Sequence, residues 1–180
     1  MLETIKNRLK NFPLERLQPG PQEQGSTAAV LVALHGDNSD PQVILTQRAF
    51  HLNNHAGEVA FPGGMWDATD TDLLQTALRE AHEEIGLLPS LVEPIATLPV
   101  AVPKRRSLKV TPFVGLVDGP LDLVADPGEI GALFDVPLRR FMNVDHYDYF
   151  EMKTEYGALN FPFLPYNGYK IWGFTLKVLT

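Results

Sequence analysis

The amino-acid sequence predicts an α+β domain in which several β-strands accompany one amphipathic helix. Short apolar runs bounded by turn-forming residues recur along the chain, as expected for strands. One segment, residues 71–85, instead repeats its apolar side chains at the period of a helix. A mostly β chain with one central helix fits an α+β fold or an α/β/α sandwich.

Length and composition indicate one folded domain. The 180 residues are 44% hydrophobic and 21% charged, which is enough apolar surface to bury a core. The formal net charge of −7 disfavours a nucleic-acid partner, and the absence of cysteine excludes disulfides, thiolate metal sites and a cysteine nucleophile. No apolar run approaches the roughly 20 residues that span a bilayer, and residues 1–10 lack the apolar core of a secretory signal. We therefore expect a soluble, cytoplasmic protein with no membrane partner.

Residues 1–25 are predicted to form a short helix and a linker that precede the main domain. Leu2, Ile5 and Leu9 have helical spacing, and Pro13 ends this helix. Residues 17–25 contain two prolines and two glycines, which indicate irregular structure. The main domain is expected to occupy residues 26–180.

Apolar runs predict the strands of this domain. The strand candidates are residues 27–34, 42–46, 92–99, 109–117 and 169–179. The Phe-Pro-Gly-Gly sequence at 61–64 is expected to be irregular, because proline and glycine disfavour regular structure. Residues 122–128 are expected to form a loop, followed by a short helical or strand element through Phe134.

The helix at 71–85 has an apolar face and a charged face. Its apolar residues fall within an arc of about 100° and its charged residues within an adjacent arc of about 140°. The first group is Leu74, Ala77, Leu78, Ala81 and Ile85, and the second is Arg79, Glu80, Glu83 and Glu84. A charged face on a helix ordinarily means contact with water only, and Gly86 can end the helix.

The spacing of the three glutamates allows a second interpretation. Glu83 and Glu84 lie three and four residues after Glu80, so the carboxylates converge on one patch. A divalent cation would offset their repulsion, because Mg²⁺ prefers carboxylate oxygens and bridges substrate phosphates. Arg79 precedes Glu83 by four residues and could hold that carboxylate in place.

This helix and the turn before it resemble the Nudix box. The box is Gly, five residues, Glu, seven residues, then Arg-Glu-apolar-any-Glu-Glu-any-Gly-apolar. Residues 79–87, Arg-Glu-Ala-His-Glu-Glu-Ile-Gly-Leu, match its second half at every defined position. The first half differs, because the spacing from Gly64 to Arg79 is one residue longer and Asp67, Asp70 or Asp72 stands where the early glutamate is expected.

The residues upstream resemble the signature of the coenzyme A diphosphatase branch of this family. That signature is Leu-Leu-Thr-any-Arg-Ser/Ala, three residues, Arg, three residues, Gly, three residues, Phe-Pro-Gly-Gly. Residues 44–49 (Ile-Leu-Thr-Gln-Arg-Ala), Gly57 and residues 61–64 match it, whereas Asn53 replaces the second arginine. The longer spacing between Gly64 and the helix motif is also similar to that branch.

The resemblance implies a Nudix α/β/α sandwich with a mixed central sheet and a catalytic loop-helix-loop. It implies Mg²⁺ or Mn²⁺ held by Glu80, Glu83 and Glu84, and hydrolysis of a diphosphate linked to another moiety. For the coenzyme A branch, coenzyme A and its derivatives would yield 4′-phosphopantetheine, or its acyl form, and adenosine 3′,5′-bisphosphate. Two alternatives remain open: a Nudix hydrolase acting on ADP-ribose, dinucleotides or nucleoside triphosphates, and a Nudix-fold binding module without turnover.

Further residues are candidates for substrate contact. Gly63 and Gly64 would let backbone amides approach an anion, with a plain turn as the alternative. Arg48 offers a planar donor fork for phosphate oxygens, or is an exposed strand residue. The cluster of Lys104, Arg105 and Arg106 could receive a 3′-phosphate, or be a solvated loop.

The general base is expected outside the helix, because a carboxylate bound to a metal has a lowered pKa and is a weaker base. Nudix enzymes resembling this one often draw a second acid from a loop distant in sequence. Residues 125–129, Ala-Asp-Pro-Gly-Glu, end in Glu129 before an apolar element, so we assign the base to Glu129. A solvent-exposed glutamate at the start of a helix is the alternative, and Glu83 is the next candidate base. The substrate is a small molecule, and the oligomeric state stays open, a homodimer included.

Overall fold

The computed structural model describes residues 1–102, 108–154 and 157–180, so Lys104, Arg105 and Arg106 lie outside the described residues. Its strands are β1 (Thr27–His35), β2 (Gln42–Arg48), β3 (Val59–Ala60), β4 (Gly63–Met65), β5 (Val92–Thr97), β6 (Lys109–Val117), β7 (Ile130–Pro137), β8 (Asp148–Thr154), β9 (Gly157–Tyr166) and β10 (Tyr169–Trp172). Its α-helices are α1 (Leu2–Leu9), α2 (Leu73–Ile85) and α3 (Gly173–Leu179), and its short 3₁₀ turns are Pro21–Glu23, Pro89–Leu91, Leu138–Arg140 and Val144–His146.

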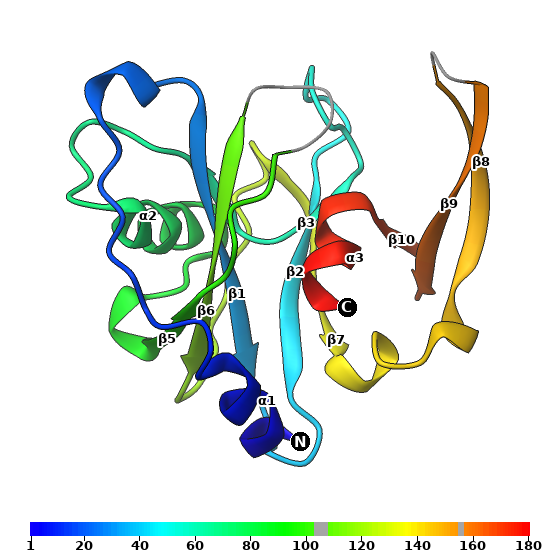
Figure 1. The fold of residues 1–180 in the computed structure, drawn as a ribbon, viewed down its shortest axis with the longest axis horizontal. Helices are drawn as coiled ribbons and strands as arrows, with labels where there is room; N and C mark the ends of the chain where they lie inside the picture. Colours follow the sequence, from blue (N-terminus) through cyan, green and yellow to red (C-terminus); the bar gives the residue numbers. More distant parts are fainter. Residues whose placement is uncertain (103–107, 155–156) are drawn as a thin grey trace.

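A mixed sheet of seven strands forms the centre of the fold. Five strands follow the order β3-β2-β1-β6-β5, while β4 pairs with β1 and β7 pairs with β2. The pairing of β1 with β6 is parallel, and the other pairings in this sheet are antiparallel. In the second sheet, β10-β9-β8, β10 packs against the main domain, and β8 and β9 project from it as a hairpin (Figure 1). The predicted α+β fold with a mixed sheet is confirmed.

Helices cover both faces of the main sheet. Alternate residues of β1 point to opposite faces, so Leu31 belongs to the core under α2, whereas Val32 belongs to the core under α3 and β10. Figure 1 shows α2 and α3 on opposite sides of the strands. The first core contains Leu74, Ala77, Ala81 and Ile85 of α2, which confirms the predicted apolar face of that helix.

The ends of α2 follow from local sequence. The helix begins after Asp72, whose side chain accepts a hydrogen bond from the backbone N–H of Gln75 at 2.8 Å. It ends at Gly86, which has the left-handed conformation with φ of 71°. The observed helix, Leu73–Ile85, is two residues shorter at its start than the predicted 71–85.

Two expectations about secondary structure are wrong. The segment Gly63–Met65 is a short strand, because Gly63 and Gly64 pair with Val30 and Ala29 of β1. Residues 169–179 are not one strand, because Gly173 has φ of 61° and the chain continues as α3. The element after residue 128 is the strand β7, and it runs beyond Phe134 to Pro137.

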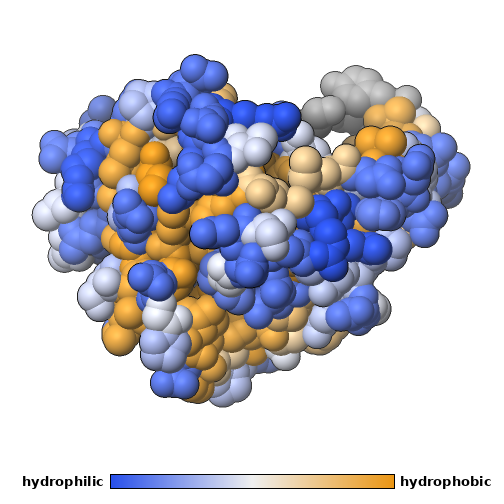
Figure 2. Space-filling view, turned by 90° about the horizontal axis from the view of Figure 1, so that it is seen from below, coloured by the Kyte–Doolittle hydropathy of each residue, from blue (hydrophilic) through white to orange (hydrophobic). Residues whose placement is uncertain are grey.

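The N-terminal segment packs on the domain. Ile5 and Leu9 of α1 contact the core that lies under α3, and the backbone N–H of Leu2 donates to the Asn38 carbonyl at 2.9 Å. Seen from below, this end of the molecule has hydrophobic side chains exposed between hydrophilic ones (Figure 2). Within the described residues, the helices are too short or too polar to cross a membrane. The domain boundary at residue 25 stays a prediction.

Candidate active site

The charged face of α2 lies against β4, and its three glutamates differ in their exposure. The side chain of Glu83 is 57% exposed, whereas that of Glu80 is 17% exposed. Glu84 is only 4% exposed. Of the two interpretations of this face, contact with water alone does not describe Glu84, because β4 pairs with β1 beside the helix and covers part of this face.

Glu84 is a buried carboxylate held by the backbone of β4. The N–H of Gly63 donates to its Oε2 at 3.1 Å. Burial raises the pKa of Glu84 to about 7, and the charges of Glu80 and Glu129 act in the same direction. The hydrogen bond from Gly63 and the charge of Arg48 oppose this shift. Arg48 and Glu129 therefore act electrostatically on the carboxylates of α2.

The two glycines of β4 leave room for different neighbours. A Cβ on Gly63 would lie 2.4 Å from the carbonyl oxygen of Ala29, so the glycine allows β4 to approach β1. A Cβ on Gly64 would lie 2.4 Å from the carboxyl carbon of Glu80. Burial raises the pKa of Glu80, and the charges of Glu83 and Glu129 add to this effect while Arg79 opposes it.

Arg79 connects α2 with the loop that follows β4. Its Nε and Nη2 donate to the carboxylate of Asp70 at 2.9 and 3.0 Å, and Nη2 also donates to the Met65 carbonyl. Its Nη1 donates to Glu80 at 2.9 Å and to Glu83 at 3.0 Å. The expected contact between Arg79 and Glu83 is therefore present.

The structure separates the roles of the three aspartates that precede α2. Asp70 is 6% exposed and accepts hydrogen bonds from Arg79, from the Thr76 hydroxyl and from the backbone N–H of Asp67. Although burial acts to raise it, the pKa of Asp70 is lowered by these hydrogen bonds. Asp72 caps the N-terminus of α2, and the Asp67 carboxylate accepts a hydrogen bond from the backbone N–H of Thr69. Of the three aspartates that the sequence offered in place of the early glutamate, Asp70 is thus the one that contacts Arg79 of the Nudix box.

Arg48 and Glu129 come from the paired strands β2 and β7. Arg48 lies opposite Ile130, and the register shifts between Gln47 and Arg48. A bulge of this kind bends a strand and redirects its side chains, often beside an active site. Among the described residues, the Arg48 side chain makes no hydrogen bond or ion pair with another residue. Glu129 is exposed at the start of a strand rather than a helix.

A protein-family model matches most of the chain. The NUDIX domain model matches residues 25–157. The chain belongs to the Nudix hydrolase family. It is therefore a hydrolase that acts on pyrophosphate bonds.

Relatives of known sequence support the family. A Salmonella newport protein described as an uncharacterized Nudix hydrolase, NudL, is 35% identical over 176 residues, which cover 98% of this chain and 91% of the relative. A Salmonella typhi protein of the same description gives the same values.

Solved Nudix structures share the fold at low sequence identity. A C. elegans Ap4A hydrolase in a binary complex has a TM-score of 0.53 and 21% identity, and the match covers 63% of this chain and 81% of that chain. The NUDIX domain of Shewanella oneidensis NrtR, complexed with ADP ribose, has a TM-score of 0.52 and 20% identity over 69% of this chain and 82% of that chain. These matches support the Nudix α/β/α sandwich.

Nudix hydrolases use divalent metal ions, and the residues of α2 fit such an ion by donor type. Glu80, Glu83 and Glu84 offer carboxylate oxygens, which Mg²⁺ and Mn²⁺ prefer. In the described part of the chain, no three acidic or histidine side chains are already gathered as a metal site. Arg79 instead holds Glu80 and Glu83, and Gly63 holds Glu84.

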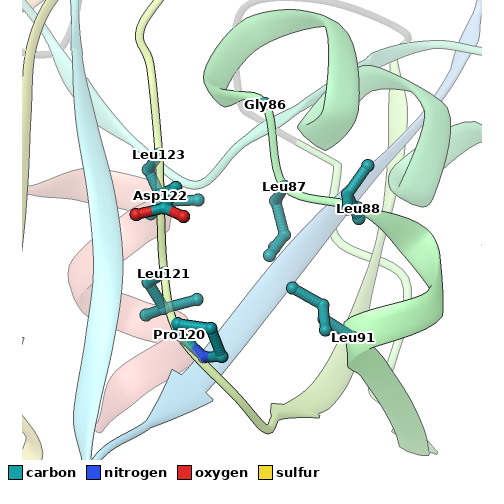
Figure 3. Close-up of a pocket in the computed structure, with 8 residues that line it drawn as sticks. All are labelled: Gly86, Leu87, Leu88, Leu91, Pro120, Leu121, Asp122 and Leu123. Carbon is teal, nitrogen blue, oxygen red and sulfur yellow. The ribbon is translucent and has the colours of Figure 1, made fainter.

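A separate apolar pocket lies beyond the C-terminal end of α2. Its volume is about 230 Å³. Figure 3 shows leucine side chains from the segment after α2 facing those of the segment before β7. The lining residues are Gly86, Leu87, Leu88, Leu91, Pro120, Leu121, Asp122 and Leu123. The pocket is lined by none of the charged residues described above, so it is separate from the candidate active site.

Proposed function

We propose that this Nudix hydrolase cleaves the diphosphate bond of coenzyme A and its acyl or oxidised derivatives. The products would be 4′-phosphopantetheine, or its acyl form, and adenosine 3′,5′-bisphosphate. One observation carries the proposal: the segment that resembles the coenzyme A signature folds against the Nudix helix. Arg48 acts on the pKa of Glu84, and the Gly63 N–H binds the Glu84 carboxylate.

In the proposed mechanism, the helix carboxylates hold the metal, and residues of the flanking strands bind the substrate. Glu80, Glu83 and Glu84 would hold Mg²⁺ or Mn²⁺, which neutralises charge on the phosphoryl oxygens when bound. Arg48 binds phosphate oxygens through its guanidinium, which is unpaired among the described residues. Arg79 orients Glu80 and Glu83 through its hydrogen bonds.

Glu129 accepts the proton of the attacking water in this mechanism. Glu129 is exposed, and its charge acts on the carboxylates of Glu80 and Glu84. Because they lack a Cβ, Gly63 leaves room for the β1 backbone and Gly64 leaves room for the Glu80 carboxylate. The cytoplasmic location and the homodimer remain predictions from the sequence.

A second candidate function is hydrolysis of another nucleoside diphosphate derivative. Asn53 replaces an arginine of the coenzyme A signature, and the Nudix domain of NrtR was solved with ADP ribose. A non-catalytic module is less consistent with this chain, because α2 keeps all three glutamates.

A substrate panel tests the proposal. Purified protein is incubated with Mg²⁺ or Mn²⁺ and coenzyme A, ADP-ribose or Ap4A, and the products are separated by chromatography. We expect coenzyme A to have the highest kcat/KM and to yield adenosine 3′,5′-bisphosphate. Preference for ADP-ribose or Ap4A would favour the second candidate, and no turnover of any compound would favour a binding module.

The basic cluster at Lys104, Arg105 and Arg106 is proposed to contact the 3′-phosphate of coenzyme A. If it does, dephospho-coenzyme A should have a lower kcat/KM than coenzyme A in the wild type. The Arg105→Ala variant should remove this difference, because it removes a donor to that phosphate. Equal kcat/KM for both compounds in the wild type would exclude this role.

The role of Glu129 is tested by Glu129→Gln. Loss of a general base lowers kcat by roughly 100-fold or more, while metal affinity should change little. Glu93→Gln is the matched control, because Glu93 is exposed on β5 and outside the proposed machinery. A kcat within a few-fold of wild type for Glu129→Gln would return the base role to α2, with Glu83 as the next candidate.

A further inference from the structure

The turn that presents Glu129 is fastened to the Nudix helix on one side. The backbone N–H of Asp126 donates to the Glu84 carbonyl at 2.8 Å. Within the turn, the Asp126 carboxylate accepts from the Gly128 N–H at 2.8 Å, and the Asp126 carbonyl accepts from the Glu129 N–H at 3.1 Å. One end of the turn therefore has a fixed distance from the end of α2.

The other side of the turn is fastened to the segment that follows β2. The backbone N–H of Ala49 donates to the Glu129 carbonyl at 2.8 Å. His51 lies two residues later, and its Nε2 is 3.0 Å from the Gly128 carbonyl. A carbonyl oxygen only accepts, so Nε2 carries the hydrogen and donates it. Two consecutive carbonyls, those of Gly128 and Glu129, are thus bound by residues 49–51.

A side chain makes the outer of these two contacts because the strand pairing stops at this point. The ladder between β2 and β7 shifts register at Gln47 and Arg48, and β7 begins at Ile130. The two segments lie side by side here, since a Cβ at Gly131 would lie 3.4 Å from the Cα of Ala49, an ordinary van der Waals contact. Beyond the Ala49 hydrogen bond, the His51 imidazole takes the place of a backbone N–H as the donor to the Gly128 carbonyl. The two residues are 77 positions apart in the sequence.

We infer that His51 is a positioning residue that holds the Glu129 turn in its productive place. This inference rests on the proposed role of Glu129 as the base. His51 is exposed and the Ala49 bond remains without it, so its loss should leave the fold intact. The base would lose orientation, and a misplacement of about 1 Å can lower a rate by about 100-fold.

A double-mutant cycle tests this inference on coenzyme A, or on ADP-ribose if coenzyme A is not hydrolysed. His51→Ala should lower kcat by about 10-fold, with KM changed less than about twofold and an unchanged melting temperature. His51→Gln should restore most of the rate, because its amide N–H can donate to the same carbonyl. In the Glu129→Gln background, His51→Ala should cause no further loss, because the group it positions is gone.

His146→Ala is the matched control for this cycle. His146 also contacts a backbone carbonyl, that of Arg140 at 3.2 Å, but it lies outside the proposed machinery. Its substitution should leave kcat unchanged.

Three results would overturn the inference. In the first, His51→Ala slows the wild type and the Glu129→Gln enzyme by the same factor. In the second, His51→Gln is as slow as His51→Ala. In the third, Glu129→Gln keeps a normal kcat, which also removes the base assignment but leaves the substrate assignment standing. A changed substrate preference with intact coupling between residues 51 and 129 would instead support the inference and refute only the coenzyme A assignment.

Discussion

Burial gives Glu84 a different chemistry from the neighbouring Glu83. Glu84 is 4% exposed, and burial raises the pKa of its carboxyl to about 7 from an ordinary 4.5. Between these values the unfolded chain releases a proton that the folded chain keeps. Glu84 therefore contributes stability to the metal-free protein at low pH, and this contribution is lost as pH rises from about 4.5 through about 7.

The variant Glu84→Gln tests this pH dependence. Glutamine resembles the protonated glutamate and cannot ionise, so it should remove a penalty of about 3 kcal/mol above pH 7. In EDTA at pH 8 we expect the variant to melt at least about 5 °C above wild type. At pH 4.5 the two proteins should melt within about 1 °C of each other, because wild-type Glu84 is then protonated. A constant difference at both pH values would contradict the assignment.

The two glycines of β4 should respond differently to alanine. In Gly64→Ala the atoms nearest to the new Cβ belong to the Glu80 carboxylate, not to the backbone, so the fold should survive while kcat falls at least about 10-fold. In Gly63→Ala the Cβ meets the Ala29 backbone, and φ is 150°, so stability should fall by about 2 kcal/mol or more. Chemical denaturation and steady-state kinetics measure both variants. Normal activity in a well-folded Gly64→Ala protein would disprove the role of Glu80.

At the scale of elements, Arg79 connects α2 with β4 and with the loop that follows it. Arg79 donates to Glu80 and Glu83 of its own helix and to Asp70 and the Met65 carbonyl outside it. The orientation of the helix carboxylates therefore depends on a buried acid in the preceding loop.

The variant Asp70→Asn should loosen this connection. An amide offers one acceptor oxygen and turns an NH₂ group toward a donor, so buried groups are left unpaired at a cost of about 1–3 kcal/mol. We expect lower stability in urea denaturation and a lower kcat, because Arg79 no longer holds Glu80 and Glu83 in place. Asp67→Asn is the control, since Asp67 is exposed and makes no hydrogen bond to Arg79. Equal effects of the two substitutions would contradict the role of Asp70.

Local sequence predicted α2 well and the segments around it less well. Its period, the Asp72 cap and the Gly86 end are properties of adjacent residues, so the sequence contains them. The strand at Gly63 and Gly64 depends on pairing with Ala29 and Val30, more than thirty positions earlier, which no local pattern shows. The burial of Glu84 has the same origin, because β4 covers it only after that pairing forms.

At the scale of the whole molecule, the sheet brings segments that are far apart in sequence together at the candidate active site. The pairing of β4 with β1 brings Gly64 to α2, and the pairing of β7 with β2 brings Glu129 beside Arg48. The sequence predicted the members of this candidate site, whereas only the fold shows that the Glu129 turn is hydrogen-bonded both to α2 and to the segment that follows β2.

This gathering predicts that Mg²⁺ stabilises the folded protein. Only the folded chain holds Glu80, Glu83 and Glu84 on one face of α2 beside β4, and a ligand that binds only the folded state raises the melting temperature as its concentration rises. At pH 8 we expect the melting temperature to rise steadily with MgCl₂. Burial disfavours the charged forms of Glu80 and Glu84, and a bound cation would offset this cost and their mutual repulsion. Glu84→Gln should lose most of this rise, whereas Glu93→Gln should keep it, and NaCl at the same ionic strength separates metal binding from screening. The same rise in Glu84→Gln would place the metal outside α2, and no rise in the wild type would contradict metal binding by the folded protein.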